Sequence, residues 1–158
     1  MTATPEGLSP RDLCFGCGPA NPYGLAIAFV PQGPEVVGTF TPRTEHQGFP
    51  GYVHGGVVAA ALDEAMGWAV YNAGAWAITG RLEVRFRHPV PVGGPLQVRA
   101  RVKEVRGRRL LAEAHLLGAD GQVLAEAVAL FLRVGPAEAA RLRAFYGLPP
   151  GEGPAASP

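Results

Sequence analysis

Asp63 is the residue whose surroundings most strongly suggest chemistry. It lies in residues 57–71, VVAAALDEAMGWAVY, a segment without proline in which Asp63 and Glu64 are the only charged residues. Burying a carboxylate in so apolar a helix costs several kcal/mol unless a partner compensates it. Asp63 lies too far inside the helix to be a cap, but an ion pair with Arg81 or Arg85 is a structural alternative. The other interpretation is a general base or nucleophile. Asp63 and Glu64 differ by about 100° around the helix, so we expect them to have different environments.

The tripeptide His54-Gly55-Gly56 comes just before this helix. Glycines at a helix start leave backbone N–H groups open to an anionic ligand, and such donors can stabilise the oxyanion of an acyl-transfer transition state. A flexible turn is the alternative, because a lone tripeptide of this kind is common. Asp63 lies about 13 Å from His54 along the helix, so one chain's Asp63 can hardly serve its own glycines. Two antiparallel helices could bring them together, which predicts active sites shared across a dimer.

Cys14 and Cys17 form a CxxC pair that could be structural, disulfide-bonded or metal-binding. Metal sites usually need four ligands, and the chain has only two cysteines, so a second chain or His46 would have to contribute. A redox pair is typical of a βαβ context, which the sequence lacks. We interpret the pair as structural cysteines in a tight CFGCG turn, and we expect neither a metal nor another cofactor.

One long helix and six strands must position these residues. The helix is apolar on all sides, which is typical of a buried helix, and Ala59, Ala60 and Ala65 would let it lie close to a sheet. Strand patterns cover residues 25–29, 36–40, 81–87, 96–105, 109–117 and 123–134, the last nearly all apolar and so expected to be central. Pro136 begins a short terminal helix over residues 137–146.

Strands that follow one another through hairpins form an antiparallel sheet, which the long helix must cover. The predicted fold class is therefore α+β, with the sheet wrapped around one buried helix. We predict an irregular segment over residues 1–23, a single domain over 24–135, the short helix over 136–147 and a disordered tail over 148–158.

Composition excludes several classes of protein. The 158 residues are 47% hydrophobic, too apolar for disorder, and their net charge of +1 gives no reason to expect nucleic-acid or membrane binding. Without a signal peptide or a long apolar run, a cytoplasmic location is expected. The scarcity of Asn and the prolines in loops fit either a thermophile or a GC-rich genome.

Three segments together resemble one family. HGGVVAAALDEAMG, the preceding EHQGFPGYVHGG and the N-terminal CFGCGPANPYGL are similar to the hotdog-fold acyl-CoA thioesterases of the PaaI-like branch. In that family HGG is followed by six residues and then by the catalytic acid, which falls on Asp63. The likeness runs from about Cys14 to Val134, and it implies hydrolysis of an acyl-CoA by a dimer or a dimer of dimers.

The resemblance also implies roles for single residues. Asp63 would be the nucleophile or a general base acting on water, and the Gly55 amide would form the oxyanion hole, with His54 and Gly56 completing the motif. A side-chain amide before the helix falls nearest to Gln47. A Ser or Thr that orients the water falls on Thr79.

Several questions stay open from the sequence. Arginines recognise the phosphates of CoA well, and we take Arg85 as the candidate. Trp68, Tyr71, Trp76 and Phe49 could line an acyl pocket or belong to the core, so the acyl group cannot be read. A non-catalytic acyl-CoA-binding protein of the same fold is the alternative, but it would not need an acid at position 63.

Overall fold

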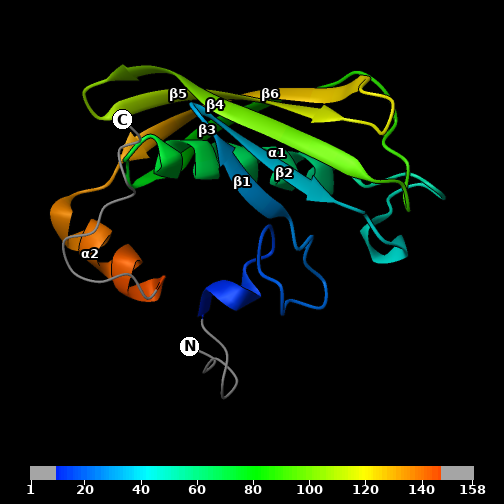
Figure 1. The fold of residues 1–158 in the computed structure, drawn as a ribbon, viewed down its shortest axis with the longest axis horizontal. Helices are drawn as coiled ribbons and strands as arrows, with labels where there is room; N and C mark the ends of the chain where they lie inside the picture. The colour runs from blue at the N-terminus through cyan, green and yellow to red at the C-terminus, as the bar shows by residue number, and fades with distance from the viewer. Residues whose placement is uncertain (1–9, 147–158) are drawn as a thin grey trace.

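The computed structural model describes residues 10–146 of the chain. A six-stranded antiparallel sheet forms one layer, and helix α1 runs along its inner face (Figure 1). This confirms the α+β architecture. The elements in chain order are η1 (Pro10–Leu13), β1 (Ala28–Gln32), β2 (Glu35–Phe40), η2 (Thr44–His46), α1 (Gly55–Asn72), β3 (Ala77–Phe86), β4 (Leu96–Arg106), β5 (Arg109–Leu117), β6 (Val123–Arg133) and α2 (Pro136–Phe145).

The strand order in the sheet is β1-β2-β4-β5-β6-β3. Strand β6, which the sequence predicts to be central, is paired on both sides but is only the second strand from the edge that β3 forms. Along β5, every second residue points to α1, and Leu110, Ala112, Ala114 and Leu116 are fully buried. This two-residue alternation is what places one face of the sheet in the core.

Helix α1 is held against the sheet by small side chains. Ala61, Ala65 and Ala69 are almost completely buried, while Ala59 and Ala60 are only half-buried. The expectation that Ala59 and Ala60 make the close approach is therefore wrong, although Ala65 does so. The residues four apart share one face of the helix, and that face meets the sheet.

The first strand begins three residues later than predicted. Leu25 and Ile27 are buried, but their N–H groups donate to the carbonyl oxygens of Phe15 (2.8 Å) and Gly16 (2.9 Å). This part of the apolar run therefore pairs with the N-terminal segment rather than with β2. Strand β1 also ends at Gln32, three residues beyond the predicted end at residue 29, and Gln32 pairs with Glu35 across the turn.

Strand β3 begins at Ala77, four residues earlier than the alternation of charges predicts. The register with β6 shifts between Thr79 and Arg81, which leaves Gly80 as a bulge. A bulge inserts one extra residue and so breaks the period of two that identifies a strand in a sequence. It lies beside Thr79, one of the candidate site residues.

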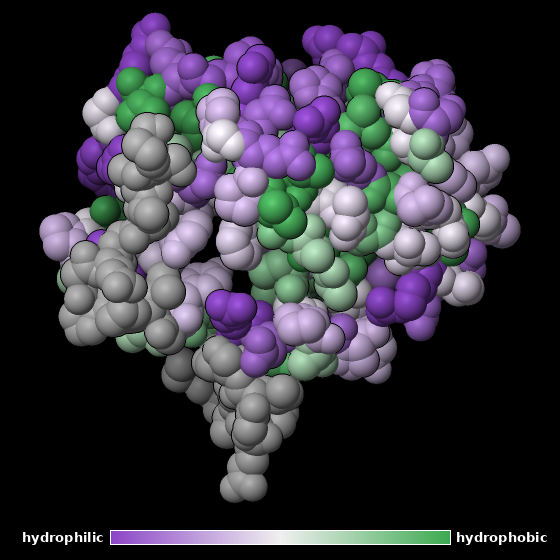
Figure 2. Space-filling view, in the orientation of Figure 1, coloured by the Kyte–Doolittle hydropathy of each residue, from purple (hydrophilic) through white to green (hydrophobic). Residues whose placement is uncertain are grey.

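The outer face of the sheet is charged. Hydrophilic residues dominate the upper edge of the molecule in Figure 2, where the sheet lies in the view of Figure 1. Helix α2 begins with Pro136 in its first turn and lies on the same side of the sheet as α1. The predicted tail over residues 148–158 lies outside the described residues. No helix within residues 10–146 is long and apolar enough to cross a membrane.

Candidate active site

Asp63 and Thr79 are brought together by α1 and the start of β3. The Thr79 hydroxyl donates a hydrogen bond of 2.8 Å to Oδ1 of Asp63. Asp63 has no ion pair within residues 10–146, so the structural alternative of a salt bridge to Arg81 or Arg85 is not what the structure contains. One carboxylate oxygen is thus held by a neutral donor.

A cavity of about 420 Å³ lies beside this pair. Its size is within the usual range for small-molecule sites. Asp63 and Thr79 contribute to its wall together with Trp68, Tyr71 and Trp76. Three of the four aromatic residues singled out in the sequence therefore line the cavity. The fourth, Phe49, is 81% exposed and lies outside it.

Of the described residues that line the cavity, Trp76 is the one with an unsatisfied buried donor. Its indole Nε1 is buried and has no hydrogen-bond partner among the described residues. A buried donor without a partner costs about 1–3 kcal/mol. A polar atom of a ligand in the cavity would relieve that cost.

The start of α1 is built by the tripeptide His54-Gly55-Gly56. His54 is the N-cap, and its Nδ1 accepts a hydrogen bond of 2.9 Å from the Gly56 N–H. The expectation of two open donors is therefore half wrong, because the histidine occupies one of them. The Gly55 N–H has no partner within residues 10–146, so it is the donor free to meet a ligand.

Gln47 lies in the loop before α1, where its backbone pairs with Val53 in an isolated bridge. Its side-chain oxygen accepts a long hydrogen bond of 3.4 Å from the Gly51 N–H. The amide nitrogen of the same side chain has no partner among the described residues. It is exposed on the surface before the helix.

Within one chain the candidate residues fall into two separate groups. Asp63 and Thr79 line the cavity, whereas His54, Gly55 and Gln47 do not. Eight residues of helix separate Gly55 from Asp63, which is about 12 Å. A single chain therefore presents the acid and the free donor at different places.

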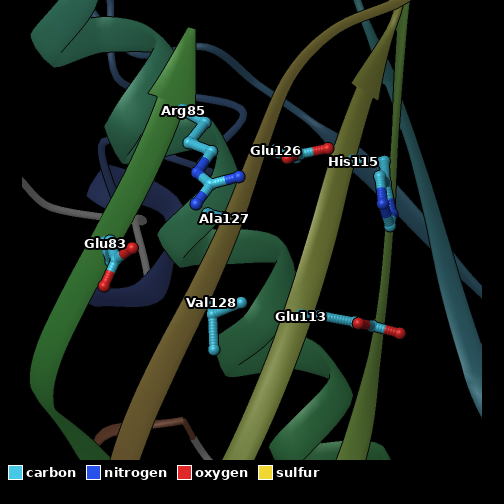
Figure 3. Close-up of a pocket in the computed structure, with 7 residues that line it drawn as sticks. All are labelled: Glu83, Arg85, Glu113, His115, Glu126, Ala127 and Val128. Atoms are coloured by element: carbon cyan, nitrogen blue, oxygen red, sulfur yellow. The ribbon is translucent and has the colours of Figure 1, made fainter.

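Arg85 belongs to neither group. It points to the outer face of the sheet, opposite α1, where it shares a shallow hollow with Glu83, Glu113, His115 and Glu126 (Figure 3). Two of the three glutamates there are ion-paired: Glu126 with Arg87, and Glu113 with Arg101 and Lys103. Such paired charges on an open sheet face are typical of a solvated surface.

Glu64 and Asp63 line the same cavity, so the expectation of different environments holds only for their hydrogen-bond partners. Cys14 Sγ lies 3.6 Å from its Oε1, and the Trp68 indole N–H donates to the same oxygen at 3.2 Å. Burial raises the pKa of Glu64 to about 7. The hydrogen bond from Cys17 lowers the pKa of Cys14 to about 5, and the same bond raises the pKa of Cys17.

His46 does not join the two cysteines. Its Nδ1 accepts from the Arg43 N–H at 3.0 Å, and its Nε2 lies 3.0 Å from the Tyr23 carbonyl oxygen. Both ring nitrogens of this buried residue are thus occupied in holding the loop before α1. The partner of the cysteines is Glu64 instead.

The sequence did not show that residues near both ends of the described chain line the cavity. Arg11 lines it from η1, and Leu142 and Tyr146 line it from the C-terminal segment. Burial raises the pKa of the Tyr146 hydroxyl to about 12. The only available signal was the aromatic pair Phe145-Tyr146 at the end of a terminal helix otherwise made of alanines and charged residues, with one proline and one leucine.

The chain is similar to known proteins in sequence. The thioesterase superfamily matches residues 50–125, from the loop before α1 to the beginning of β6. Acyl-coenzyme A thioesterase THEM4 of Mus musculus is 32% identical over 91 residues, which are 57% of this chain and 39% of the relative. The chain thus spans well under half the length of that relative.

Solved structures share the fold. The thioesterase superfamily protein RHA08564 is 32% identical, with a TM-score of 0.74, over 77% of this chain and 60% of that one. A hypothetical thioesterase of Streptococcus pneumoniae TIGR4, solved with coenzyme A, is 14% identical with a TM-score of 0.66, over 69% and 89%. That protein was also solved with an aspartate replaced by alanine, and with a threonine sixteen positions later replaced by alanine.

Proposed function

Because residues 50–125 match the thioesterase superfamily and the chain has a hotdog fold, we propose that this protein hydrolyses acyl-CoA thioesters to a free acid and coenzyme A. The observation that carries the proposal is the Asp63–Thr79 pair in the wall of an aromatic-lined cavity. The spacing of this pair adds support, since it equals that of the aspartate and threonine replaced in the Streptococcus pneumoniae thioesterase.

Asp63 supplies the base or the nucleophile. With Oδ1 held by the Thr79 hydroxyl, Oδ2 is free to take a proton from water or to attack the carbonyl carbon itself. In the first route, the hydroxide adds to the thioester carbon, the C–S bond breaks, and the CoA thiolate takes up a proton. In the second, Oδ2 adds to the thioester carbon, the C–S bond breaks to give an acyl-aspartyl anhydride, and the departing CoA thiolate takes up a proton. Water then cleaves the anhydride to the free acid and restores the Asp63 carboxylate.

The Gly55 N–H would stabilise the oxyanion, but in the site of a second chain. A Cβ on Gly55 would lie 3.5 Å from Phe86 Cζ, so the start of α1 lies beside the end of β3. Asp63 lies beside the start of β3, through Thr79. A two-fold axis that pairs two β3 edges antiparallel therefore brings the Gly55 of one chain toward the Asp63 of the other.

The remaining candidates have supporting roles in this proposal. His54 accepts from the Gly56 N–H and so holds the helix start, and the free amide of Gln47 would contact the thioester or the water. Arg85 is a candidate for a CoA phosphate only from the outer face of the sheet. The assignment to the PaaI-like branch rests on the motifs alone.

The first test measures hydrolysis of a panel of acyl-CoAs with short, medium-chain and aryl acyl groups. Release of the free CoA thiol is the signal. Asp63→Asn should lower kcat at least about 100-fold on the best substrate, the scale expected when a general base or nucleophile is lost. Asp120→Asn is the matched control, because Asp120 lies in the β5–β6 turn and does not line the cavity. Near-normal turnover by folded Asp63→Asn would remove Asp63 from the mechanism.

A non-catalytic acyl-CoA-binding protein is the alternative function. It would bind members of the panel, seen by calorimetry, and release no thiol from any of them. The neutral hydrogen-bonding environment of Asp63 favours the enzyme, because a binding protein has no use for a carboxylate at the cavity wall.

A further inference from the structure

Cys14, Cys17 and Glu64 converge where the N-terminal segment meets α1. Their two Sγ atoms and a carboxylate oxygen all lie within 4.8 Å of one another. We propose that these three residues form a binding site for a thiophilic divalent cation, with zinc as the best fit. The site is separate from the hydrolytic chemistry proposed for Asp63, and it does not depend on it.

The spacing of the donor atoms fits zinc. Zinc bonds of about 2.3 Å to sulfur and about 2.0 Å to oxygen at tetrahedral angles separate a sulfur from an oxygen ligand by about 3.5 Å. Cys14 Sγ and Glu64 Oε1 are 3.6 Å apart. An ion could therefore bind without any displacement of this pair.

The loop that carries the cysteines is built around this contact. A Cβ on Gly16 would lie 2.4 Å from Glu64 Cγ, and one on Gly18 would lie 2.4 Å from the backbone nitrogen of Cys14. Only glycine allows so close an approach at either position. The Gly18 N–H also donates to the Cys14 carbonyl oxygen at 3.0 Å, which closes the turn.

Glu64 has the surroundings of a metal ligand rather than of an ion-paired acid. It has no salt bridge to a basic residue within residues 10–146. The Trp68 indole N–H donates to its Oε1, which is the kind of outer hydrogen bond that orients ligating carboxylates. A cation would compensate the negative charge of the Glu64 carboxylate, whereas a Cys14–Cys17 disulfide would leave that charge uncompensated.

Three protein ligands leave one position of a tetrahedral ion for water. Glu64 also lines the cavity beside Asp63, so the ion would fasten the N-terminal segment to α1 at the cavity wall. The ligand count was the argument against metal in the sequence. That count left out Glu64, which is fifty residues from Cys14 along the chain.

The test uses the full chain, stripped of metal under reducing conditions and titrated with Co²⁺ and then with Zn²⁺ against a chromophoric chelator. We expect one ion per chain, a thiolate-to-cobalt charge-transfer band and the visible bands of tetrahedral cobalt. Cys14→Ser and Cys17→Ser should each abolish the charge-transfer band or halve it. Glu64→Gln, which preserves shape, should weaken zinc binding at least about 10-fold.

Glu45→Gln is the control, because Glu45 is an exposed acid outside the cysteine cluster. The zinc affinity of this variant should equal that of the wild type. Circular dichroism establishes that each variant is folded. The proposal is overturned if the reduced wild type gives no cobalt–thiolate band. It is equally overturned if Glu64→Gln binds zinc as tightly as wild type, or if one ion is bound per two chains.

Discussion

The hydrogen bond between Thr79 and Asp63 leaves the acid only half satisfied. One carboxylate oxygen accepts from the hydroxyl at 2.8 Å, while no residue of the described chain donates to the other. The threonine both fixes the direction of the carboxylate and lies close enough to share a water with it. At the scale of single residues, this pair is the reactive unit of the proposed site.

Thr79→Val removes the hydroxyl and keeps the branched shape. Hydrogen bonds to charged groups contribute about 1.5–3 kcal/mol, so kcat should fall by about 10- to 100-fold. Thr79→Ser keeps the donor and should retain most of the activity. Thiol release measured under saturating acyl-CoA distinguishes the two, and equal rates for Thr79→Val and wild type would show that the hydroxyl has no role.

The site residues differ in how visible they are in the sequence. Asp63 and His54-Gly55-Gly56 belong to one segment, so helix geometry alone relates them. The contact between Cys14 and Glu64 joins positions fifty residues apart, and no periodicity predicts which loop returns to the helix. The position of Tyr146 at the cavity is equally unpredictable, because the sequence of helix α2 does not specify how that helix packs.

Helix α1 shapes the cavity, and it contains an unexpected glycine, Gly67, in its interior. A Cβ at Gly67 would meet no atom within 4 Å, although the residue lies in the middle of the helix and lines the cavity. Glycine in a helix interior costs about 1 kcal/mol relative to alanine. Its presence therefore leaves space in the cavity at the expense of helix stability.

Gly67→Ala should raise the free energy of unfolding by about 0.5–1 kcal/mol. It should also raise KM for the bulkier acyl groups more than for short ones, because the methyl group enters the cavity wall. Denaturant unfolding and kinetics across the acyl-CoA panel measure the two effects. If Gly67→Ala were less stable than the wild type, the space beside Gly67 would have to be occupied in the folded protein, which would contradict this explanation.

The limits of a strand were predicted well where hydrophobic residues alternate along it. They were predicted poorly where the backbone bonds to another segment or where a bulge interrupts the alternation. The limits of β4, β5 and β6 agree with their patterns to within one residue. The start of β1 does not, because Leu25 and Ile27 pair with the N-terminal segment. The bulge at Gly80 hides the start of β3 in the same way.

Strands β4 and β5 are joined by an ion-pair cluster whose effect depends on pH. Arg101 and Lys103 lie 2.8 and 2.9 Å from the Glu113 carboxylate. Burial acts to raise the pKa of Glu113, but these two partners outweigh it and hold the pKa below its ordinary value of 4.5. A lowered pKa means that the contribution is complete above the unfolded-state pKa and is lost as pH falls through the folded-state pKa.

Glu113→Gln should therefore destabilise the protein by at most about 1 kcal/mol near neutral pH. The difference from wild type should shrink as the pH of the unfolding experiment is lowered below the folded-state pKa. Glu104→Gln, which removes a more exposed acid paired with Arg106, should have a smaller effect at every pH. A difference that grows toward acid pH would have the wrong sign for this explanation.

At the scale of the whole molecule, no strand within residues 10–146 pairs with the outer side of the edge strand β3. It is ten residues long and exposes Ile78 and Phe86, whose side chains are both 56% exposed. A long open edge is a template for pairing with another chain. Full antiparallel overlap of two β3 strands would put Thr79 of one chain opposite Val84 of the other, close to that chain's Phe86 and Gly55.

Mixing two inactive chains tests the shared site most directly. Asp63→Asn lacks the acid, and Gly55→Pro lacks the proposed oxyanion donor. Proline is tolerated at the first helical position, which Gly55 occupies, and the folding of each variant is established first. The chains are unfolded and refolded together, because subunit exchange must be complete before thiol release from acyl-CoA is measured.

Random pairing makes about half of the dimers heterodimers, and each of these has one intact site of two. The account predicts recovery of about a quarter of the wild-type rate, while each variant alone stays near background. If both variants fold and exchange subunits, and the mixture is no more active than either parent, then each site is built within one chain. That result would contradict the placement of Asp63 opposite the Gly55 of a second chain.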